Sequence, residues 1–337
     1  MNRSFFSRLF LAGALVAATL ASVPAQAGRF SSMFVFGDSL SDTGNLKIAS
    51  PGDYPPPAAG PYFNGRLSDG PIWIDTLAAD LGLPAGAVPY SAGTGGTNYA
   101  IAGARTGSVG SPPGLLAQVA GLWNGVGDLN ALYVVVGGGN DMRDARSLYQ
   151  TNSAFDIAGR QAAAEAAAAN LASSIGFLTL HGAMHVLMSD LPNIGLTPEA
   201  SLLGLQYAST DVSNRFDALM PALLAAGAGF GLDMSFLDMA GIQQAVIADA
   251  TTNGGATYGI TDVTHPCAGF TFSPGNACSS SMFSDVLHPS AAMHLLIGEA
   301  AFAAVVPEPE IYALLALGLV AVVLRGRRRA KKVTASA

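Results

Sequence analysis

The sequence predicts an α/β protein in which a parallel sheet is covered by helices on both faces. Short apolar runs typical of buried strands alternate with longer segments of helical spacing and propensity through the middle of the chain. Small polar or glycine-rich residues follow several of these strand-like runs, as at the carboxyl edge of a parallel sheet. Neither an internal repeat nor an interdomain linker interrupts the pattern. We therefore expect one domain over residues 28–306.

Each predicted element rests on its own local pattern. Strands are predicted from apolar runs at residues 33–36, 132–136, 184–191 and 231–237. Helices are predicted at residues 71–81, 157–180, 199–226, 239–249 and 289–304. The first of these helices carries proline at an opening position, and the second is rich in alanine. Loops are expected where proline and glycine gather, at residues 50–70 and 93–96.

The first 27 residues have the layout of a secretory signal peptide. Arg3 and Arg8 precede an apolar stretch over residues 9–23, which is followed by Ala-Gln-Ala at 25–27. A membrane anchor is the alternative, but the apolar run is short and ends in a small-residue cleavage site. We therefore predict that the protein is exported and that its mature chain begins near Gly28.

The last 31 residues, 307–337, form a second targeting pattern. Pro-Glu-Pro at 307–309 is followed by fourteen apolar residues and then by six cations within residues 325–332. A buried core helix would not accommodate these cations. Fourteen residues are fewer than the ~20 that usually span a bilayer, although flanking arginines can snorkel. Positive charge favours the cytoplasmic side, which would leave the domain outside the inner membrane.

The order of these three parts resembles the PEP-CTERM sorting signal. The resemblance implies recognition and removal of the tail by an exosortase, in a Gram-negative bacterium that makes exopolysaccharide. It also implies transient association of the tail helix with the inner membrane, before release to the periplasm, the cell surface or the extracellular matrix.

The charge of the predicted domain limits its partners. Residues 28–306 contain eight lysines and arginines against 21 aspartates and glutamates, a formal charge of −13, whereas the whole chain has −7. Such a surface repels nucleic acid and anionic membranes. Neutral substrates, such as esters of lipids or sugars, suit it better, and no cofactor or metal is expected.

Two cysteines, Cys267 and Cys278, lie close together in a segment rich in glycine, serine and proline. In an exported protein the expectation is a disulfide that closes a short loop. A metal site is the alternative, but only His265 stands nearby and no second pair of ligands exists. We predict the disulfide.

Three polar clusters could carry chemistry. Ser39 follows the first predicted strand, Asn140-Asp141 follows the second, and Asp285 and His288 precede the last helix. Taken alone, the first cluster could be an ordinary helix cap. A serine nucleophile needs a base such as histidine, and a carboxylate must orient the imidazole. Asp285 and His288, three positions apart in one turn, can supply both.

The negative charge that develops on an ester carbonyl also needs hydrogen-bond donors. The candidates are the backbone N–H groups of Ser39 and Gly103 and the side-chain amide of Asn140. Glycine at 103 would let the backbone approach a substrate closely. Other glycines lie near it in the chain, at positions 93, 95 and 96.

These blocks, in this order, resemble the GDSL (SGNH) hydrolase family: Gly37-Asp38-Ser39-Leu40, Gly103, Gly138-Gly139-Asn140-Asp141 and Asp285-x-x-His288. Residues 64–71 and 189–192 are also similar to its lipase/esterase branch. The resemblance implies a three-layer α/β/α sandwich with a flavodoxin-like sheet. It also implies Ser39, Asp285 and His288 as the catalytic triad, with Ser39, Gly103 and Asn140 as the oxyanion hole.

The expected function is therefore that of an exported serine esterase or lipase, which hydrolyses carboxylic esters through an acyl-enzyme. Its partners would be a small-molecule, lipid or sugar ester and an exosortase-type processing enzyme, not nucleic acid. One alternative is removal of acetyl groups from an exopolysaccharide. A second is a non-catalytic surface or matrix protein that keeps the fold. The chain has no G-x-S-x-G elbow, which disfavours the usual α/β-hydrolase arrangement.

Overall fold

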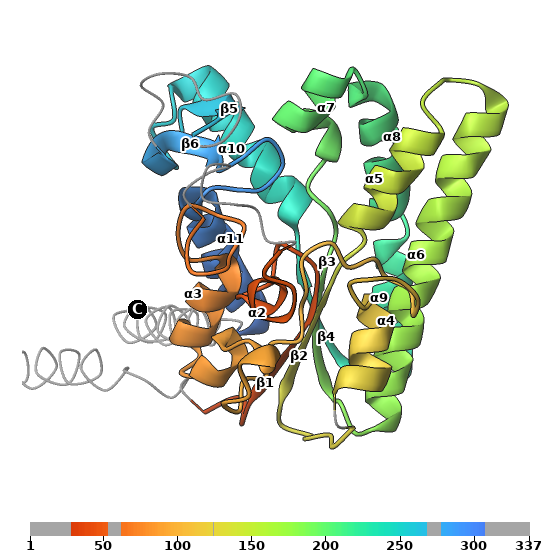
Figure 1. The fold of residues 1–337 in the computed structure, drawn as a ribbon, viewed down its shortest axis with the longest axis vertical. Coiled ribbons are helices and arrows are strands. Elements are labelled where there is room, and N and C mark those ends of the chain that lie inside the picture. The colour runs from red at the N-terminus through yellow and green to blue at the C-terminus, as the bar shows by residue number, and fades with distance from the viewer. Residues whose placement is uncertain (1–27, 53–61, 124, 268–277, 307–337) are drawn as a thin grey trace, which may run out of the picture.

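The computed structural model describes residues 28–52, 62–123, 125–267 and 278–306 (Figure 1). The predicted signal peptide (1–27), the predicted sorting tail (307–337) and part of the predicted loop at 50–70 lie outside the described residues.

The centre of the fold is a parallel sheet of four strands in the described part of the chain, in the order β1-β2-β3-β4. The strands are β1 (Met33–Gly37), β2 (Leu132–Val136), β3 (His185–Ser189) and β4 (Asp233–Leu237). All three neighbouring pairs are parallel. The four predicted strands are confirmed, although β3 and β4 are shorter than predicted.

The segment 97–101 extends this sheet on the other side of β1. Val35 donates its backbone N–H to the Thr97 carbonyl at 3.0 Å, and Tyr99 donates back to the Val35 carbonyl at 2.7 Å. The pairing is parallel but remains an isolated bridge, so the segment is not a full strand. The sheet therefore grows outward from β1 in both directions, as in a flavodoxin-like fold. This pairing also delivers Gly103 to the carboxyl end of β1.

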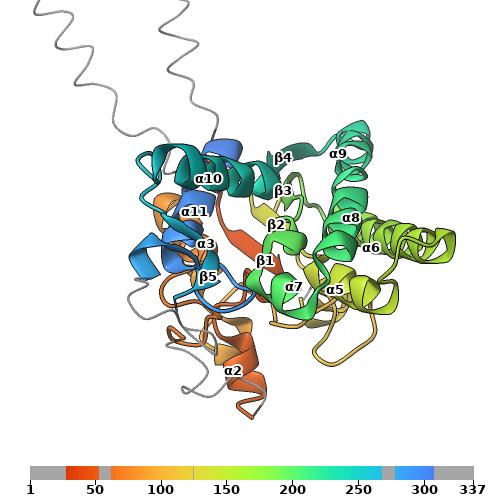
Figure 2. The same cartoon turned by 90° about the horizontal axis from the view of Figure 1, so that it is seen from above.

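Helices cover both faces of the sheet, which makes three layers (Figures 1 and 2). One face carries α3 (Trp73–Asp80), α10 (Met239–Asn253) and α11 (Ala291–Val305). The other carries α4 (Leu115–Ala117), α5 (Gly139–Leu148), α6 (Ala154–Leu180), α8 (Gln206–Asp217) and α9 (Met220–Gly229). The predicted three-layer α/β/α sandwich is confirmed.

The remaining elements are short. They are α2 (Asn45–Ala49), α7 (Pro198–Leu203), the strands β5 (Asp262–Pro266) and β6 (Ser281–Phe283), and the single turns of helix at Pro84–Ala87, Tyr90–Ala92, Gln118–Leu122, Ile194–Leu196 and Cys278–Ser280. β5 and β6 pair in parallel as a small separate sheet, which the sequence pattern did not reveal. Cys267 directly follows β5, and it forms a disulfide with Cys278.

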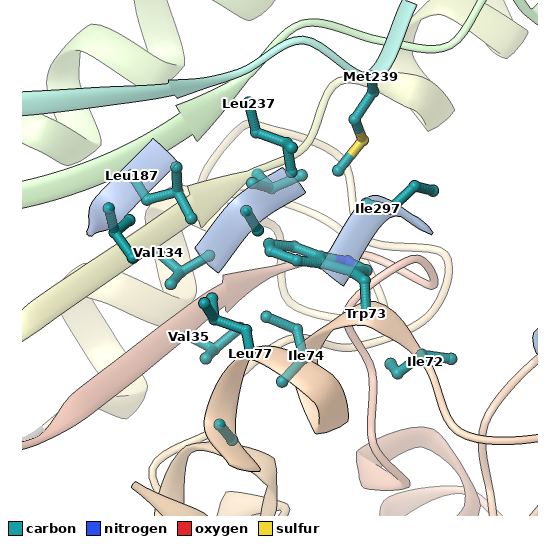
Figure 3. Packing of buried hydrophobic residues seen from close by; sticks show 14 of the residues in the cluster. Val35, Ile72, Trp73, Ile74, Leu77, Val134, Leu187, Leu237, Met239 and Ile297 are labelled. Carbon is teal, nitrogen blue, oxygen red and sulfur yellow. The ribbon is translucent and has the colours of Figure 1, made fainter. Parts of the chain in front are cut away.

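Alternate residues of each strand enter different cores, because side chains of a strand point to opposite faces. Val35, Val134 and Leu187 face α3 and α11, where they pack with Trp73 and Ile297 (Figure 3). The neighbouring positions, Phe36, Val135 and Met188, enter the other cluster. Burying each such side chain contributes roughly 1.5–3 kcal/mol, so two filled cores hold the sheet edge that carries the site in place.

The predicted helix at 199–226 is wrong as a single element, since it is three helices, α7, α8 and α9. Gly204 ends α7 in a left-handed conformation, with φ of 68°. Pro221 then stands in the first turn of α9, where its missing N–H does no harm, whereas inside a longer helix it would break a hydrogen bond. α5 was also missed, because its start lies in a run of glycines.

α6 is long and apolar enough to cross a membrane by length and composition. The position of α6 in the fold explains its length and apolar composition without a membrane. Ala164, Leu171 and Ile175 recur on one side of the helix and are buried in the core beneath the sheet. α6 is therefore a core helix that covers one face of the sheet.

Candidate active site

Ser39 stands where the chain leaves β1, at the carboxyl edge of the sheet. Gly37 is needed there, because a Cβ at this position would lie 2.4 Å from the Val136 carbonyl oxygen. The Gln118 side-chain amide forms hydrogen bonds with both backbone polar groups of Gly37: it accepts the N–H at 2.9 Å and donates to the carbonyl at 2.8 Å. The backbone at the end of β1 is thus satisfied by a side chain, and the next residues can turn into the cleft.

Asp42 holds the turn that follows Ser39. Its carboxylate accepts backbone N–H groups from residues 44–46, at 2.6–3.1 Å. It also accepts the N–H of Ala102 at 2.8 Å, which ties the turn to the segment that carries Gly103. Asp42 therefore positions two parts of the site rather than taking part in proton transfer.

The structure brings Ser39, His288 and Asp285 into one hydrogen-bonded line. The His288 Nε2 atom lies 2.9 Å from the Ser39 Oγ atom, across 249 positions of sequence. On the other side of the ring, His288 Nδ1 lies 2.7 Å from Asp285 Oδ2. The other oxygen, Oδ1, accepts the backbone N–H groups of Leu287 and His288. One tight turn thus supplies both the imidazole and the carboxylate that orients it.

The surroundings of Asp285 keep it ionised. Burial by itself would raise the pKa of this carboxyl group. The His288 charge, the hydrogen bonds from His288 and a hydrogen bond from the Tyr62 hydroxyl outweigh burial, so the pKa lies well below its ordinary value. When the imidazole is neutral, a carboxylate at Oδ2 favours the tautomer that carries its proton on Nδ1. In that state His288 Nε2 faces Ser39 as a proton acceptor.

Gly103 and Asn140 reach the same place from two other segments. Gly103 has φ of 85°, a left-handed conformation that favours glycine. A single cleft is lined by Ser39, Gly103, Asn140 and His288. The nearby glycines at 93, 95 and 96 line neither this cleft nor the pocket described next. Of the alternatives left open by the sequence, position 103 is the one next to Ser39.

A second recess, here called the apolar pocket, also has Ser39 in its lining. Apart from Ser39, Asn140 and His288, its walls are mostly aliphatic or sulfur-containing side chains, among them Leu191, Pro192, Ile194, Met282, Leu287, Met293 and Ile297. This lining suits an apolar ligand group.

Buried and partly buried carboxyl groups stand beside the apolar pocket. Asp38 lines it, and burial raises the pKa of this group to about 6. Behind the pocket wall, burial and the neighbouring Asp217 carboxylate raise the pKa of Asp190 to about 7, and burial raises that of Asp217 to about 6. Asp190 accepts the N–H of Met239 at 2.7 Å, and Asp217 accepts that of Leu191 at 2.9 Å. The pair thus holds the wall loop against two helices.

His294, on α11, does not belong to the chemistry. It is 1% exposed, and its Nδ1 accepts the backbone N–H of Trp73 at 3.4 Å. Burial lowers the pKa of His294 to about 3, so the ring is neutral. His294 therefore has a structural role between α11 and α3.

Four further side chains support the site: Tyr62, Gln118, Arg143 and Glu199. Tyr62 contacts Asp285, and Gln118 closes the end of β1. Arg143 lines both recesses and contacts Asn140 and Glu199. Tyr62, Gln118 and Glu199 left no signal in the sequence, because each reaches the site from a distant segment. Arg143 did leave a signal in the sequence, since it stands one helical turn after Asn140.

One grouping of metal-binding side-chain types occurs in the described residues, and it joins Asp69 with Cys267 and Cys278. The two sulfur atoms are bonded to each other. A disulfide offers no thiolate to a metal ion. This cluster is therefore a cross-link beside a carboxyl group.

Comparison with known proteins adds several relatives. The chain is 26% identical to a phosphatidylcholine-sterol acyltransferase of Aeromonas hydrophila over 331 residues, which covers 81% of this chain and 89% of that protein. It is 28% identical to esterase EstA of Pseudomonas aeruginosa over 336 residues, covering 86% and 49%. A GDSL esterase/lipase of Arabidopsis thaliana is 37% identical over 116 residues, covering 31% and 28%. The matches span between 23% and 30% of the length of this plant protein and two other curated relatives.

Among solved structures, an extracellular lipase from Streptomyces rimosus aligns with a TM-score of 0.41 and 18% identity, covering 80% of this chain and all of that one. A likeness at this level supports no statement about function. The family matches are more extensive. Residues 305–329 match the PEP-CTERM protein-sorting motif, and residues 33–301 match GDSL-like lipase/acylhydrolase. Since the second match spans well over half of the 337 residues, the chain belongs to the GDSL-like lipase/acylhydrolase family.

Proposed function

We propose that this protein is an exported serine hydrolase that cleaves carboxylic esters through an acyl-enzyme on Ser39. The observation that carries the proposal is the continuous line of hydrogen bonds from Ser39 through His288 to Asp285. A serine hydroxyl is a weak nucleophile unless a base removes its proton during attack. The line supports the proposal, because His288 could act as such a base for Ser39 and Asp285 could orient the imidazole.

The reaction proceeds in two halves. Ser39 Oγ attacks the ester carbonyl carbon while its proton moves to His288 Nε2, and Asp285 stabilises the imidazolium that forms. The carbon–oxygen bond to the alcohol then breaks, and His288 returns the proton to the leaving oxygen. In the second half, water attacks the acyl-enzyme with the same proton transfers. This regenerates Ser39 and releases the carboxylic acid.

Three donors would meet the negative charge on the carbonyl oxygen. They are the backbone N–H groups of Ser39 and Gly103 and one N–H of the Asn140 amide. The other N–H of this amide is donated to the Ala104 carbonyl at 3.0 Å, which fixes the side chain at the start of α5. Fixed donors cost no reorganisation during the reaction, and one of them is worth roughly 2.7–4 kcal/mol in the transition state.

Each of the two recesses beside Ser39 would bind a different part of the ester substrate. We assign the acyl chain to the apolar pocket, because burying each CH₂ group contributes about 0.8 kcal/mol. The other cleft contains Ser50, Ser111, Asn140 and Arg143 and suits a hydroxyl-bearing alcohol. Lipid and sugar esters both combine an acyl chain with such an alcohol. Removal of acetyl groups from an exopolysaccharide is the second candidate, favoured by the PEP-CTERM match at residues 305–329.

Export and processing form part of the proposal. Residues 1–27 would direct secretion, and residues 28–306 would form the hydrolase domain. The tail, residues 307–337, would hold the protein at the inner membrane until an exosortase-type enzyme removes it. A secreted protein that still carries the basic cluster at 325–329 would contradict the processing step.

Turnover of p-nitrophenyl acetate and butyrate tests the enzymatic proposal. The wild type should hydrolyse both and react with a fluorophosphonate probe, whereas Ser39→Ala should lose the labelling and at least 10³-fold of the turnover. If the folded wild type shows neither turnover nor labelling, the protein is non-catalytic and only keeps this fold.

A further inference from the structure

Arg143, on α5, joins the oxyanion side of the site to the histidine side. Its guanidinium contacts Asn140 one helical turn earlier and Glu199 on α7. We propose that Arg143 and Glu199 form a brace that positions the Asn140 amide relative to the loop 285–288. This inference rests on the proposed esterase function, because it concerns how well one donor of that reaction is placed.

The first half of the brace fixes the orientation of the Asn140 amide. Its Oδ1 accepts from Arg143 NH1 at 3.3 Å, and its Nδ2 donates to the Ala104 carbonyl at 3.0 Å. Rotating the amide by half a turn would place an NH₂ group against the guanidinium and an oxygen against a carbonyl. Both contacts would then be repulsive. With Arg143 in place, one N–H of Nδ2 keeps its free direction for a substrate.

The second half of the brace is a forked ion pair. Arg143 donates to Glu199 through Nε at 3.1 Å and through NH2 at 2.5 Å. The buried guanidinium of Arg146 contacts the same carboxylate and donates to Ser209 Oγ at 3.1 Å. Burial alone would raise the pKa of Glu199, but the two arginines outweigh it and the pKa is lowered. Glu199 therefore remains charged, and the fork fixes the Arg143 side chain in one direction.

The brace ends at the loop that holds the triad. The backbone N–H of Glu199 donates to the Val286 carbonyl at 2.7 Å, between Asp285 and His288. α7 lies between this loop and α5 in both views of the fold (Figures 1 and 2). One residue of a six-residue helix thus contacts the loop through its backbone and α5 through its side chain. A shift of α7 would move the oxyanion donor and the triad together.

A cycle of four proteins tests the brace: wild type, Arg143→Met, Asn140→Ala and the double variant. Asn140→Ala should lower kcat by on the order of 10²-fold, since an oxyanion donor is lost. Arg143→Met should lower kcat about tenfold with little change in KM, because the donor acts mainly in the transition state. In the Asn140→Ala background, Arg143→Met should cost less than about twofold more, because the side chain that it positions is gone.

The chain offers a matched control in Arg215, which also forms a two-pronged ion pair with a carboxylate, Asp211, on α8. Its side chain is 26% exposed, compared with 33% for Arg143. Arg215→Met should leave kcat unchanged. Arg143→Lys should recover only part of the lost rate, since an ammonium cannot form the fork. Glu199→Gln, which retains the backbone contact to Val286, replaces Arg143→Met in the cycle if the latter does not fold.

Two results would overturn the brace. One is an unchanged kcat in folded Arg143→Met. The other is a loss of kcat that multiplies with the loss from Asn140→Ala, which would mean that Arg143 acts elsewhere. A wild type without turnover or fluorophosphonate labelling would instead contradict the proposed function, and with it the brace. If the wild type is active but the kcat values of the four proteins differ from the predicted pattern, the brace is contradicted and the proposed function is not.

Discussion

The Tyr62 hydroxyl and the His288 imidazole share one oxygen of Asp285. Tyr62 donates to Oδ2 at 2.6 Å, and His288 Nδ1 lies 2.7 Å from the same atom. The sequence offered no reason to associate Tyr62 with the triad, because 223 positions separate it from Asp285. The contact stabilises the ionised carboxylate and restricts where the imidazole can sit.

Tyr62→Phe should therefore weaken the proposed triad without removing it. A hydrogen bond to a charged group is worth about 1.5–3 kcal/mol. Part of this stabilisation of Asp285 is the same whether His288 is neutral or protonated, so only the remainder affects kcat. We expect kcat to fall about 3- to 10-fold with KM nearly unchanged, measured with p-nitrophenyl butyrate. Tyr258→Phe, at a tyrosine outside both recesses, is the control. Equal kcat in Tyr62→Phe and wild type would show that the shared oxygen does not affect the reaction.

The apolar pocket should set the preferred acyl length. Met293, on α11, lines the pocket and is 3% exposed, so Met293→Ala should deepen the pocket. We expect kcat/KM for octanoate relative to acetate esters to rise several-fold, because each accommodated CH₂ contributes about 0.8 kcal/mol. The substitution should also cost about 2–5 kcal/mol of folding stability.

Met220→Ala provides the matched control for this experiment. Met220 is fully buried in the core on the opposite face of the sheet and lines neither recess. Its loss should destabilise the protein similarly while leaving the acyl-length profile unchanged. The same shift of profile in both variants would mean that loosened packing, not pocket depth, controls the preference.

Stability should fall as the pH rises through about 6 to 7. The pKa values of Asp38 and Asp217 are raised to about 6, and that of Asp190 to about 7. A carboxyl whose pKa is raised by folding binds its proton more tightly in the folded state, so its contribution is present at low pH and lost above the folded pKa. Below about pH 4 the opposite holds for carboxylates with lowered pKa values, such as Asp285.

Asp190→Asn tests this origin of the pH dependence. The asparagine oxygen can still accept the N–H of Met239, but it has no charge to bury. Between pH 5 and pH 8 the wild type should lose about 1–3 kcal/mol of stability relative to the variant, because only the wild type carries a group at this position that titrates in the interval. Thermal unfolding across this range provides the measurement. Parallel curves for the two proteins would show that Asp190 does not titrate in this interval.

The Cys267–Cys278 disulfide should stabilise the small β5–β6 sheet. The two cysteines are 11 positions apart, and a loop of this size contributes roughly 2–3 kcal/mol in the chain-entropy model. Replacing both by serine should lower the free energy of unfolding by this amount in urea titrations. Reduction of the wild type should produce the same loss, and reduction of the double variant should produce none. A reductant effect in the double variant would point to a cause other than the cross-link.

Much of this protein is determined by local sequence. The apolar run 132–136 predicts a buried strand, and the alanine-rich segment around 157–180 predicts a helix by propensity and length, and both are confirmed. The pairing of Asp285 with His288 is also local, because one turn brings them together. The alternation of such elements was enough to predict the layers of the fold.

The tertiary structure decided which distant segments meet. Packing of α11 against α3, beside β1, carries His288 to Ser39, and backbone pairing with β1 delivers Gly103. Tyr62, Gln118 and the Arg143–Glu199 brace depend on the same long-range packing. The prediction of one helix at residues 199–226 is wrong for a related reason. Residues with high helix propensity fill this segment, and their pattern does not reveal that a glycine and a proline divide it into three helices. Periodicity records which face of an element is buried, whereas the identity of the partner across the core depends on the whole fold.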